Sequence, residues 1–180
     1  ERGYIRFFRE HPEFYRETES AAAVAVVRTF RSHAFGGRRV ELSTILAEQT
    51  LLEASVPFDI VLDGRLEEAG GLARYSLLIL ADQVYLTAGQ VRALRGFVEA
   101  GGDLLLIGKT GTQQPDLRSA TRQEVSRTKP LGEWLGDEYP GETASVRRFG
   151  RGRMAYLPAI VPATDVPLPV KPLWGMPYLY

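Results

Sequence analysis

Residues 77–107 read LLILADQVYLTAGQVRALRGFVEAGGDLLLI and predict one complete strand-helix-strand unit. The continuous apolar runs Leu77–Leu80 and Leu104–Ile107 are typical of strands buried on both faces of a parallel sheet. Between them, apolar residues recur at helical spacing. Thr87 followed by Gln90 forms a capping box that starts this helix, and the Gly101-Gly102 pair ends it. The unit therefore predicts a parallel sheet with helical connections.

The same pattern extends toward the N-terminus. Short apolar runs at Ala22–Val27 and Phe58–Leu62 predict two more strands. A polar loop through Gly36, Gly37 and Arg39 follows the first run. A helix then begins near Ser43 and ends before Pro57. Repeated strands and helices with short connections predict an open α/β sheet with right-handed crossovers.

The C-terminal third does not continue this alternation of strands and helices. Residues 109–130 are polar and predict a long loop. Leu131–Leu135 predicts one helical turn. Ala144–Phe149 and Met154–Leu157 flank a glycine-containing turn and predict a late β-hairpin. Prolines concentrate near the C-terminus, so we expect residues 161–180 to form an extended tail.

Residues 1–20 differ from the α/β domain that we assign to residues 21–160. Aromatic residues alternate with charged ones, and Pro12 interrupts any long helix. We expect a connector helix from a preceding domain, whose aromatic side chains pack against that domain. An aromatic and basic nucleic-acid surface is the alternative, although the interspersed Glu residues disfavour it.

Composition excludes several classes of function. The 180 residues include 22 Lys+Arg and 22 Asp+Glu, giving a net charge of +0, and no cysteine. Disulfides, thiolate metal sites and a Cys nucleophile are thereby excluded. Balanced charge disfavours nucleic acid and anionic membranes as partners. There is no apolar run of about 18 residues, so we expect a soluble protein without a membrane span, cytoplasmic rather than secreted.

Ligands of open parallel sheets bind outside the carboxyl ends of the strands. The candidate ligand-binding residues at these positions are Arg31, His33, Phe35, Asp63, Asp82, Lys109 and Thr110. We expect Asp63 and Asp82 to end adjacent strands, which makes them candidates for an acid/base pair. Alternatively, each carboxylate stabilises its own loop by accepting backbone N–H bonds.

Familiar catalytic and cofactor motifs are missing. Gly108-Lys109-Thr110 resembles part of a phosphate-binding loop, but that motif needs a glycine at position 103, which is Asp. No glycine follows the first strand before Gly36, which excludes a dinucleotide fingerprint. There is no Gly-x-Ser-x-Gly elbow, and two separated histidines do not form a zinc site. We therefore expect neither a cofactor nor a bound metal.

Several stretches together resemble the β-galactosidase trimerisation domain, the middle domain of β-galactosidase-like glycoside hydrolases. The stretches that carry the resemblance are Arg9–Tyr15, Thr18–Ala21, Val24–Arg28, Ser32–Phe35, Leu51–Leu62, Tyr75–Leu80, Leu86–Gly102 and Gly150–Pro158. The resemblance covers most of residues 5–160. It implies a flavodoxin-like open sheet with helices on both faces, similar to class I glutamine amidotransferases.

The resemblance also implies a function. A catalytic (β/α) barrel would precede this domain in the same chain, and the family name suggests homotrimers. Amidotransferases carry a Cys nucleophile after the strand that corresponds to Leu104–Ile107, where this chain has Lys109 or Thr110. A Thr without an adjacent base is not an activated nucleophile, so no catalytic residue is assigned.

We therefore expect a non-catalytic oligomerisation or accessory domain of a glycoside hydrolase, which lends loops to a carbohydrate site. The alternatives are a stand-alone sugar or metabolite binding module, and a small hydrolase that uses Asp63 and Asp82.

Overall fold

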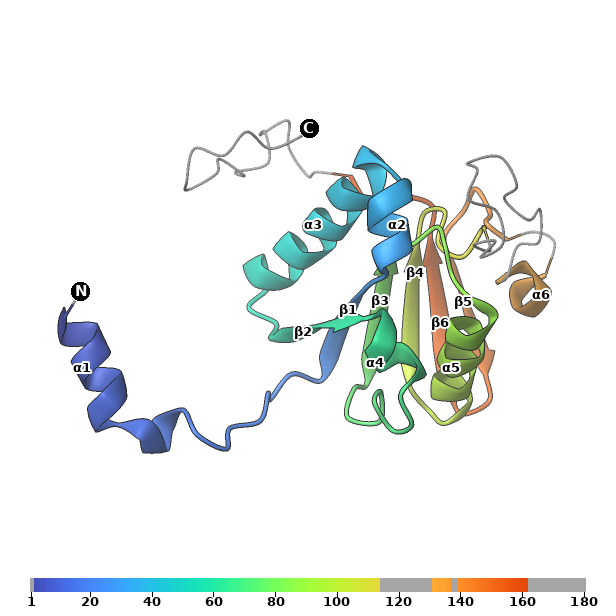
Figure 1. Cartoon of the computed structure of the whole chain (residues 1–180). Helices are drawn as coiled ribbons and strands as arrows, with labels where there is room; N and C mark the ends of the chain where they lie inside the picture. Colours follow the sequence, from blue (N-terminus) through green and yellow to red (C-terminus); the bar gives the residue numbers. More distant parts are fainter. Residues whose placement is uncertain (1, 114–130, 137–138, 162–180) are drawn as a thin grey trace.

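The computed structural model describes residues 2–113, 131–136 and 139–161. Over these ranges the chain forms a sheet with flanking helices (Figure 1). The elements in chain order are α1 (Arg2–Glu10), η1 (Pro12–Phe14), β1 (Val24–Arg28), α2 (Phe30–Phe35), α3 (Arg38–Glu53), β2 (Phe58–Leu62), α4 (Asp63–Glu67), β3 (Leu77–Ala81), α5 (Ala88–Glu99), β4 (Asp103–Ile107), α6 (Gly132–Leu135), β5 (Ser145–Phe149) and β6 (Gly152–Leu157).

The strands form one six-stranded sheet in the order β2-β1-β3-β4-β6-β5. Neighbouring strands are parallel except for β5 and β6, which form the antiparallel hairpin. The five parallel strands follow the order of flavodoxin-like sheets, in which the direction of winding reverses between β1 and β3. The predicted fold class, an open α/β sheet with a late hairpin, is confirmed.

Each face of the sheet packs against its own helices. On one face, buried Leu80 belongs to a cluster that includes Leu94 of α5 and Leu66 of α4. On the other face, Val26 clusters with Ala47 of α3. Figure 1 shows α3 and α5 on opposite sides of the strands. Burial on both faces explains why the strands are continuously apolar instead of alternating.

The ends of α5 agree with the prediction. The Thr87 hydroxyl accepts the Gln90 N–H at 3.0 Å, and the Gln90 side chain accepts the Thr87 N–H at 2.9 Å, which completes the capping box. Gly101 follows the helix with φ 117°, a left-handed conformation that glycine adopts without a Cβ clash. The turn then leads directly into β4.

The stretch between β1 and β2 differs from the prediction. Residues 30–35 form α2 where we expected a loop, and α3 begins at Arg38 instead of near Ser43. Gly37 separates the two helices with φ 71°. The early start of α3 was hidden because its first turn is polar apart from Val40, which is fully buried.

The N-terminal helix α1 lies apart from the sheet and is joined to β1 by an extended segment (Figure 1). Pro12 begins the short helix η1 and interrupts α1, as predicted. The role of residues 1–20 as a connector stays a prediction. Most of the predicted loop at 109–130 and of the tail at 161–180 lies outside the described residues.

Candidate functional site

All seven candidate residues follow the carboxyl ends of parallel strands. Arg31, His33 and Phe35 lie on α2, directly after β1. Asp63 begins α4 after β2, Asp82 follows β3, and Lys109 and Thr110 follow β4. Parallel strands end at the same edge, so the fold gathers these residues at one edge of the sheet. Their environments, however, differ.

Asp82 is buried and joins three elements. Its carboxylate accepts hydrogen bonds from the Ser43 hydroxyl at 2.5 Å, the Arg39 Nε at 3.1 Å and the Lys109 backbone N–H at 2.8 Å. Its φ of 48° is unusual for a residue other than glycine. Gly108 permits the close approach, because a Cβ there would lie 2.2 Å from Asp82 Oδ1. The Asp82 carboxylate therefore fastens α3 and the β4 loop to the end of β3.

Gln83 is the centre of a buried polar network that sequence analysis missed. Its side-chain oxygen accepts the Thr29 N–H at 2.8 Å, and its Nε2 donates to the Ala81 carbonyl at 3.0 Å and to Thr44 Oγ1 at 3.2 Å. Gln83, Thr29 and Thr44 are all fully or almost fully buried. A glutamine two residues after the end of a continuously apolar strand was the available signal, since such a residue has little access to water.

Thr110 belongs to the same interior network. Its hydroxyl accepts the Gln83 backbone N–H at 3.1 Å and lies 2.8 Å from the Ile107 carbonyl, to which it donates. The side chain is fully buried. Thr110 therefore holds the loop after β4 to the loop after β3, and its hydroxyl is not exposed to a substrate.

Asp63 belongs to a separate set of contacts. Its carboxylate accepts the Phe30 N–H at 2.5 Å and the Gln90 side-chain N–H at 2.7 Å. The expectation that Asp63 and Asp82 end adjacent strands was wrong, because β1 lies between β2 and β3. Within the described residues the two carboxylates share no hydrogen-bond partner. The Asp63 carboxylate joins the start of α4 to α2 and α5, whereas the Asp82 carboxylate joins the end of β3 to α3 and the β4 loop.

The remaining candidates form the outer surface of this edge. Phe35 is 68% exposed and packs edge-to-face against Tyr85, with ring centroids 6.5 Å apart. The Lys109 side chain is exposed, and Arg31 is half-buried. Tyr85, which was not among the seven predicted residues, donates its backbone N–H to buried Ser32 Oγ at 3.0 Å. These contacts attach α2 to the loop after β3.

His33 is the histidine of this edge. Its Nε2 is buried and has no hydrogen-bond partner among the described residues. Burial lowers the pKa of His33 below its ordinary value, and the nearby positive charge of Arg28 adds to this effect. The neutral imidazole is therefore favoured in the folded protein.

A second polar cluster holds the segment before β1 against the edge of the sheet. Asp59 of β2 accepts hydrogen bonds from the Ser20 hydroxyl at 2.6 Å and the Tyr75 hydroxyl at 2.9 Å. Arg74 donates to the Ser20 carbonyl and lies 3.7 Å from the Asp59 carboxylate. The Ser20 hydrogen bond is the main cause that lowers the pKa of Asp59. The cluster fixes where the chain enters the domain.

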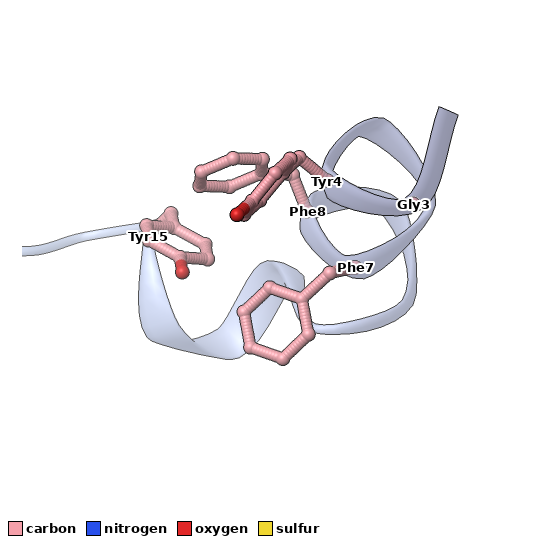
Figure 2. Close-up of a pocket in the computed structure, with 5 residues that line it drawn as sticks. All are labelled: Gly3, Tyr4, Phe7, Phe8 and Tyr15. Carbon is pink, nitrogen blue, oxygen red and sulfur yellow. The ribbon is translucent and has the colours of Figure 1, made fainter. Parts of the chain in front are cut away.

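The N-terminal helix carries an aromatic surface, seen in Figure 2. A hollow of about 610 Å³ is lined by Gly3, Tyr4, Phe7, Phe8 and Tyr15. Six large apolar side chains of residues 4–15 are between 44% and 77% exposed. Arg6 pairs with Glu10 at 2.7 Å across one helical turn, so positive charge there is locally neutralised.

Metal and membrane features are absent from the part of the chain that the structure describes. Over those residues, no group of three or more His, Asp or Glu side chains is arranged to hold a metal ion. None of the helices in the same ranges is both long and apolar enough to cross a bilayer.

Together, the strand order and the hydrogen-bonded carboxyl edge define a flavodoxin-like α/β domain. Solved structures with a similar fold include several β-galactosidases. A catalytic mutant of a GH42 β-galactosidase from G. stearothermophilus matches with a TM-score of 0.58 and 16% identity, over 77% of this chain and 27% of that chain. The β-galactosidase from Bacillus circulans sp. alkalophilus matches with a TM-score of 0.57 and 13% identity, over 84% of this chain and 30% of that chain.

A third similar structure is the polyextremophilic β-galactosidase from Halorubrum lacusprofundi, with a TM-score of 0.54 and 17% identity, over 88% of this chain and 31% of that chain. At such identities the likeness shows a common fold. This chain spans less than a third of the length of each of these enzymes. No protein-family model matches the chain, and no curated protein matches its sequence.

Proposed function

We propose that this chain is a non-catalytic accessory domain of a β-galactosidase-like glycoside hydrolase, corresponding to the trimerisation domain that its sequence resembles. In this proposal the aromatic surface of residues 4–15 packs against a preceding catalytic barrel of the same polypeptide. The observation that carries the proposal is the fold likeness to about a quarter to a third of each β-galactosidase chain, combined with this exposed aromatic surface.

The aromatic surface supports a partner domain for a physical reason. Phe8, Phe14 and Tyr15 are each about half or more exposed, although they lie close together on the molecule. A contiguous apolar patch on a soluble protein marks an interaction surface, because covering it releases water. Residues 4–16 carry three Arg and two Glu, and Arg6 pairs with Glu10, so the net charge beside the patch is small, which favours an apolar partner over a nucleic acid.

The carboxyl edge supports a role without catalysis. The Asp82 carboxylate is fully engaged by Ser43, Arg39 and the Lys109 N–H. The buried Thr110 hydroxyl has no histidine or carboxylate among its hydrogen-bond partners in the described residues. A nucleophile needs a neighbouring base and access to substrate, and Thr110 has neither.

A direct activity assay tests this proposal. The 180-residue chain is incubated with chromogenic galactosides, and no turnover above the uncatalysed rate is expected. A matched comparison uses Asp63→Asn and Asp82→Asn. Turnover by the parent chain that either variant abolishes would establish the small-hydrolase alternative and overturn the non-catalytic role.

The proposal includes a homo-oligomer, with a trimer expected from the resemblance. Light scattering on the chain joined to its preceding domain measures this directly. Variants Phe7→Ser and Phe8→Ser should weaken the contact between the two domains, which hydrogen exchange on α1 would report. Unchanged exchange on α1 between the joined and the separate chain would contradict the packing role of this helix.

A sugar-binding module is the second candidate function, favoured by the exposed aromatic ring of Phe35 at the same edge of the sheet as Arg31, His33 and Lys109. Flat aromatic faces bind the apolar faces of sugars, while charged groups beside them bind hydroxyl groups. Calorimetric titration of the chain with a panel of mono- and disaccharides tests this function. Binding that Phe35→Ala weakens and Phe14→Ala leaves intact would support it, and a flat panel would contradict it.

A further inference from the structure

Strands β4 and β6 carry apolar side chains on both faces of the sheet, yet only one face is deeply buried. On the face that carries α5, Leu104, Leu106 and Tyr156 are at most 5% exposed. On the face that carries α3, Leu105 of β4 is only half-buried and Leu157 of β6 is 37% exposed. Inner strands of a parallel sheet are apolar on both sides because both sides are normally covered. A further covering layer is therefore expected over this half of the α3 face.

Helix α3 covers the other half of that face. It packs over β1 and β3, whereas β6 and β5 continue the sheet beyond β4. Leu105, Ala155 and Val146 are in register across β4, β6 and β5, so they form one row on the α3 face. Val146 is 70% exposed and Ala155 is half-buried. This row, together with Leu157, is called the β4–β5 stripe below.

The chain continues onto this face after β6. Ile160, three residues past the end of β6, packs against the cluster on the α3 face that contains Ala47 and Ile107. Ile107 is in register with Leu157, so Ile160 lies beside the β4–β5 stripe. Val161 follows and is 74% exposed. Residues 158–160 therefore bring the chain to the edge of the surface that needs a cover.

The sequence that follows is suited to an extended cover. Residues 162–180 contain ten apolar residues and five prolines, with one Asp and one Lys. Among them, Val166, Leu168 and Val170 alternate with Pro167 and Pro169. Proline fixes φ, lacks an N–H and restricts the residue before it to extended conformations, so this run disfavours a helix. In an extended strand, alternate side chains point to the same side, which gives the run one apolar face.

The length of this segment fits the stripe. The seven residues 166–172 span about 22 Å at about 3.1 Å per residue. Crossing from β4 to β5 takes about 10 Å, at about 4.8 Å for each of two strand spacings. Residues 162–165 supply about 12 Å more between Val161 and the alternating run. The segment can therefore cross the stripe directly from the point at which the chain reaches this face.

We infer that residues 162–172 lie as an extended strap across the β4–β5 stripe, with Leu168 over Ala155 and Val146. The strap takes the place over β4, β6 and β5 that α3 has over β1 and β3. Covalent attachment through Ile160 gives this segment a high effective concentration at the stripe, which favours it over a separate partner. The strap uses neither the aromatic surface of residues 4–15 nor a contact between copies, so it is compatible with the proposed barrel packing and homotrimer.

The absence of cysteine makes the strap testable by thiol labelling of the full chain. In Val146→Cys the only thiol lies under the strap, and in Leu62→Cys it lies on β2, at the opposite edge of the sheet. The two positions are 70% and 59% exposed, so without a strap both thiols should react with Ellman's reagent at similar rates. We expect Val146→Cys to react at least about tenfold more slowly than Leu62→Cys, because labelling requires the strap to open locally.

Two further variants identify the strap as the cause of this protection. Adding Leu168→Asp to Val146→Cys should restore fast labelling, because docking would bury an unpaired carboxylate. Thr164→Asp adds the same charge outside the alternating run and should leave the protection in place. Leu62→Cys should respond to neither change. Equal labelling of the two thiols would overturn the inference, and so would protection of Val146→Cys that Leu168→Asp leaves intact.

A measurement on the unsubstituted chain identifies which copy supplies the strap. Methyl NOEs between Leu168 and Ala155 should appear in the uniformly labelled chain. They should be absent from isotope-filtered spectra of mixed labelled and unlabelled chains. NOEs in the filtered spectra would assign the strap to a neighbouring copy and overturn docking within one chain. Failure of either test would leave the proposed accessory function intact, because neither test depends on α1 or on the absence of catalysis.

Discussion

The carboxylate of Asp82 accepts the backbone N–H of Lys109 at 2.8 Å, across the carboxyl ends of β3 and β4. Two residues that the sequence marks as ligand candidates are thus partners in an internal contact. Only the Lys109 side chain faces solvent, and the backbone of Lys109 belongs to the interior. This arrangement uses the Asp82 carboxylate to hold the loops after β3 and β4 together.

Removing the Asp82 carboxylate should destabilise the domain. Asp82→Ala leaves the Ser43 hydroxyl and the Lys109 N–H without their acceptor, at a cost of roughly 2 to 4 kcal/mol in unfolding free energy. Asp82→Asn retains one acceptor oxygen and tolerates the left-handed backbone, so its cost should be smaller. Urea denaturation measures both. Equal stability of Asp82→Ala and the parent chain would contradict the anchoring role.

Gly108 should not tolerate a side chain. Its φ is 64°, and a Cβ would meet Asp82 Oδ1 at 2.2 Å. We expect Gly108→Ala to lower the unfolding free energy by about 2 kcal/mol or more, since the left-handed backbone alone costs about 1 to 2 kcal/mol. The control is Gly96→Ala within α5, where a Cβ meets nothing within 4 Å. That change should stabilise the domain by about 0.5 to 1 kcal/mol.

His33 should make stability depend on pH near neutrality. Its folded pKa lies below the ordinary value of 6.5 because of burial. As the pH falls below about 6.5, the unfolded chain binds a proton at this residue before the folded protein does, so stability decreases. His33→Asn should remove this part of the pH dependence. Denaturation series between about pH 5 and 8 test the difference.

Ser20 should control the titration of Asp59. The folded pKa of Asp59 is lowered chiefly by the Ser20 hydrogen bond, so its stabilising effect is present above the ordinary value of 3.8 and is lost as the pH falls through the lower folded value. Ser20→Ala should raise the pKa of Asp59, as a carboxyl-detected NMR titration can show. Thr18→Ala serves as the control. An unchanged Asp59 titration in Ser20→Ala would reject this assignment.

The strands that are buried on both faces could be predicted, because such strands are continuously apolar in sequence. Leu77–Leu80 and Leu104–Ile107 predicted β3 and β4, and the Thr87 capping box located α5. In contrast, α2 escaped prediction because its large apolar residues Phe30 and Phe35 are exposed, so the segment has no inward apolar face. Helical periodicity is recognised from apolar residues that repeat on one buried face. The buried residue of α2 is Ser32, which is polar, so the periodicity gives no signal there.

The candidate site was predictable in position but not in accessibility. Strand ends located Asp82 and Thr110 at the carboxyl edge, because parallel strands end together. Whether each side chain points inward depends on partners far along the chain, such as Ser43 for Asp82 and Gln83 for Thr110. The same limitation concealed the strand order, and with it the separation of Asp63 from Asp82. Local sequence carries no record of these distant contacts.

The network around Gln83 lies between the ends of β1 and β3, where the winding of the sheet reverses and where related sheets receive their ligands. Here the protein fills that position with its own amide group. Gln83 makes to Thr29 and Thr44 the kind of hydrogen bonds that a bound molecule would otherwise make. The Gln83 side chain thus occupies the position that a ligand takes in related sheets. A new binding pocket at this point would first require replacing Gln83 with a smaller residue.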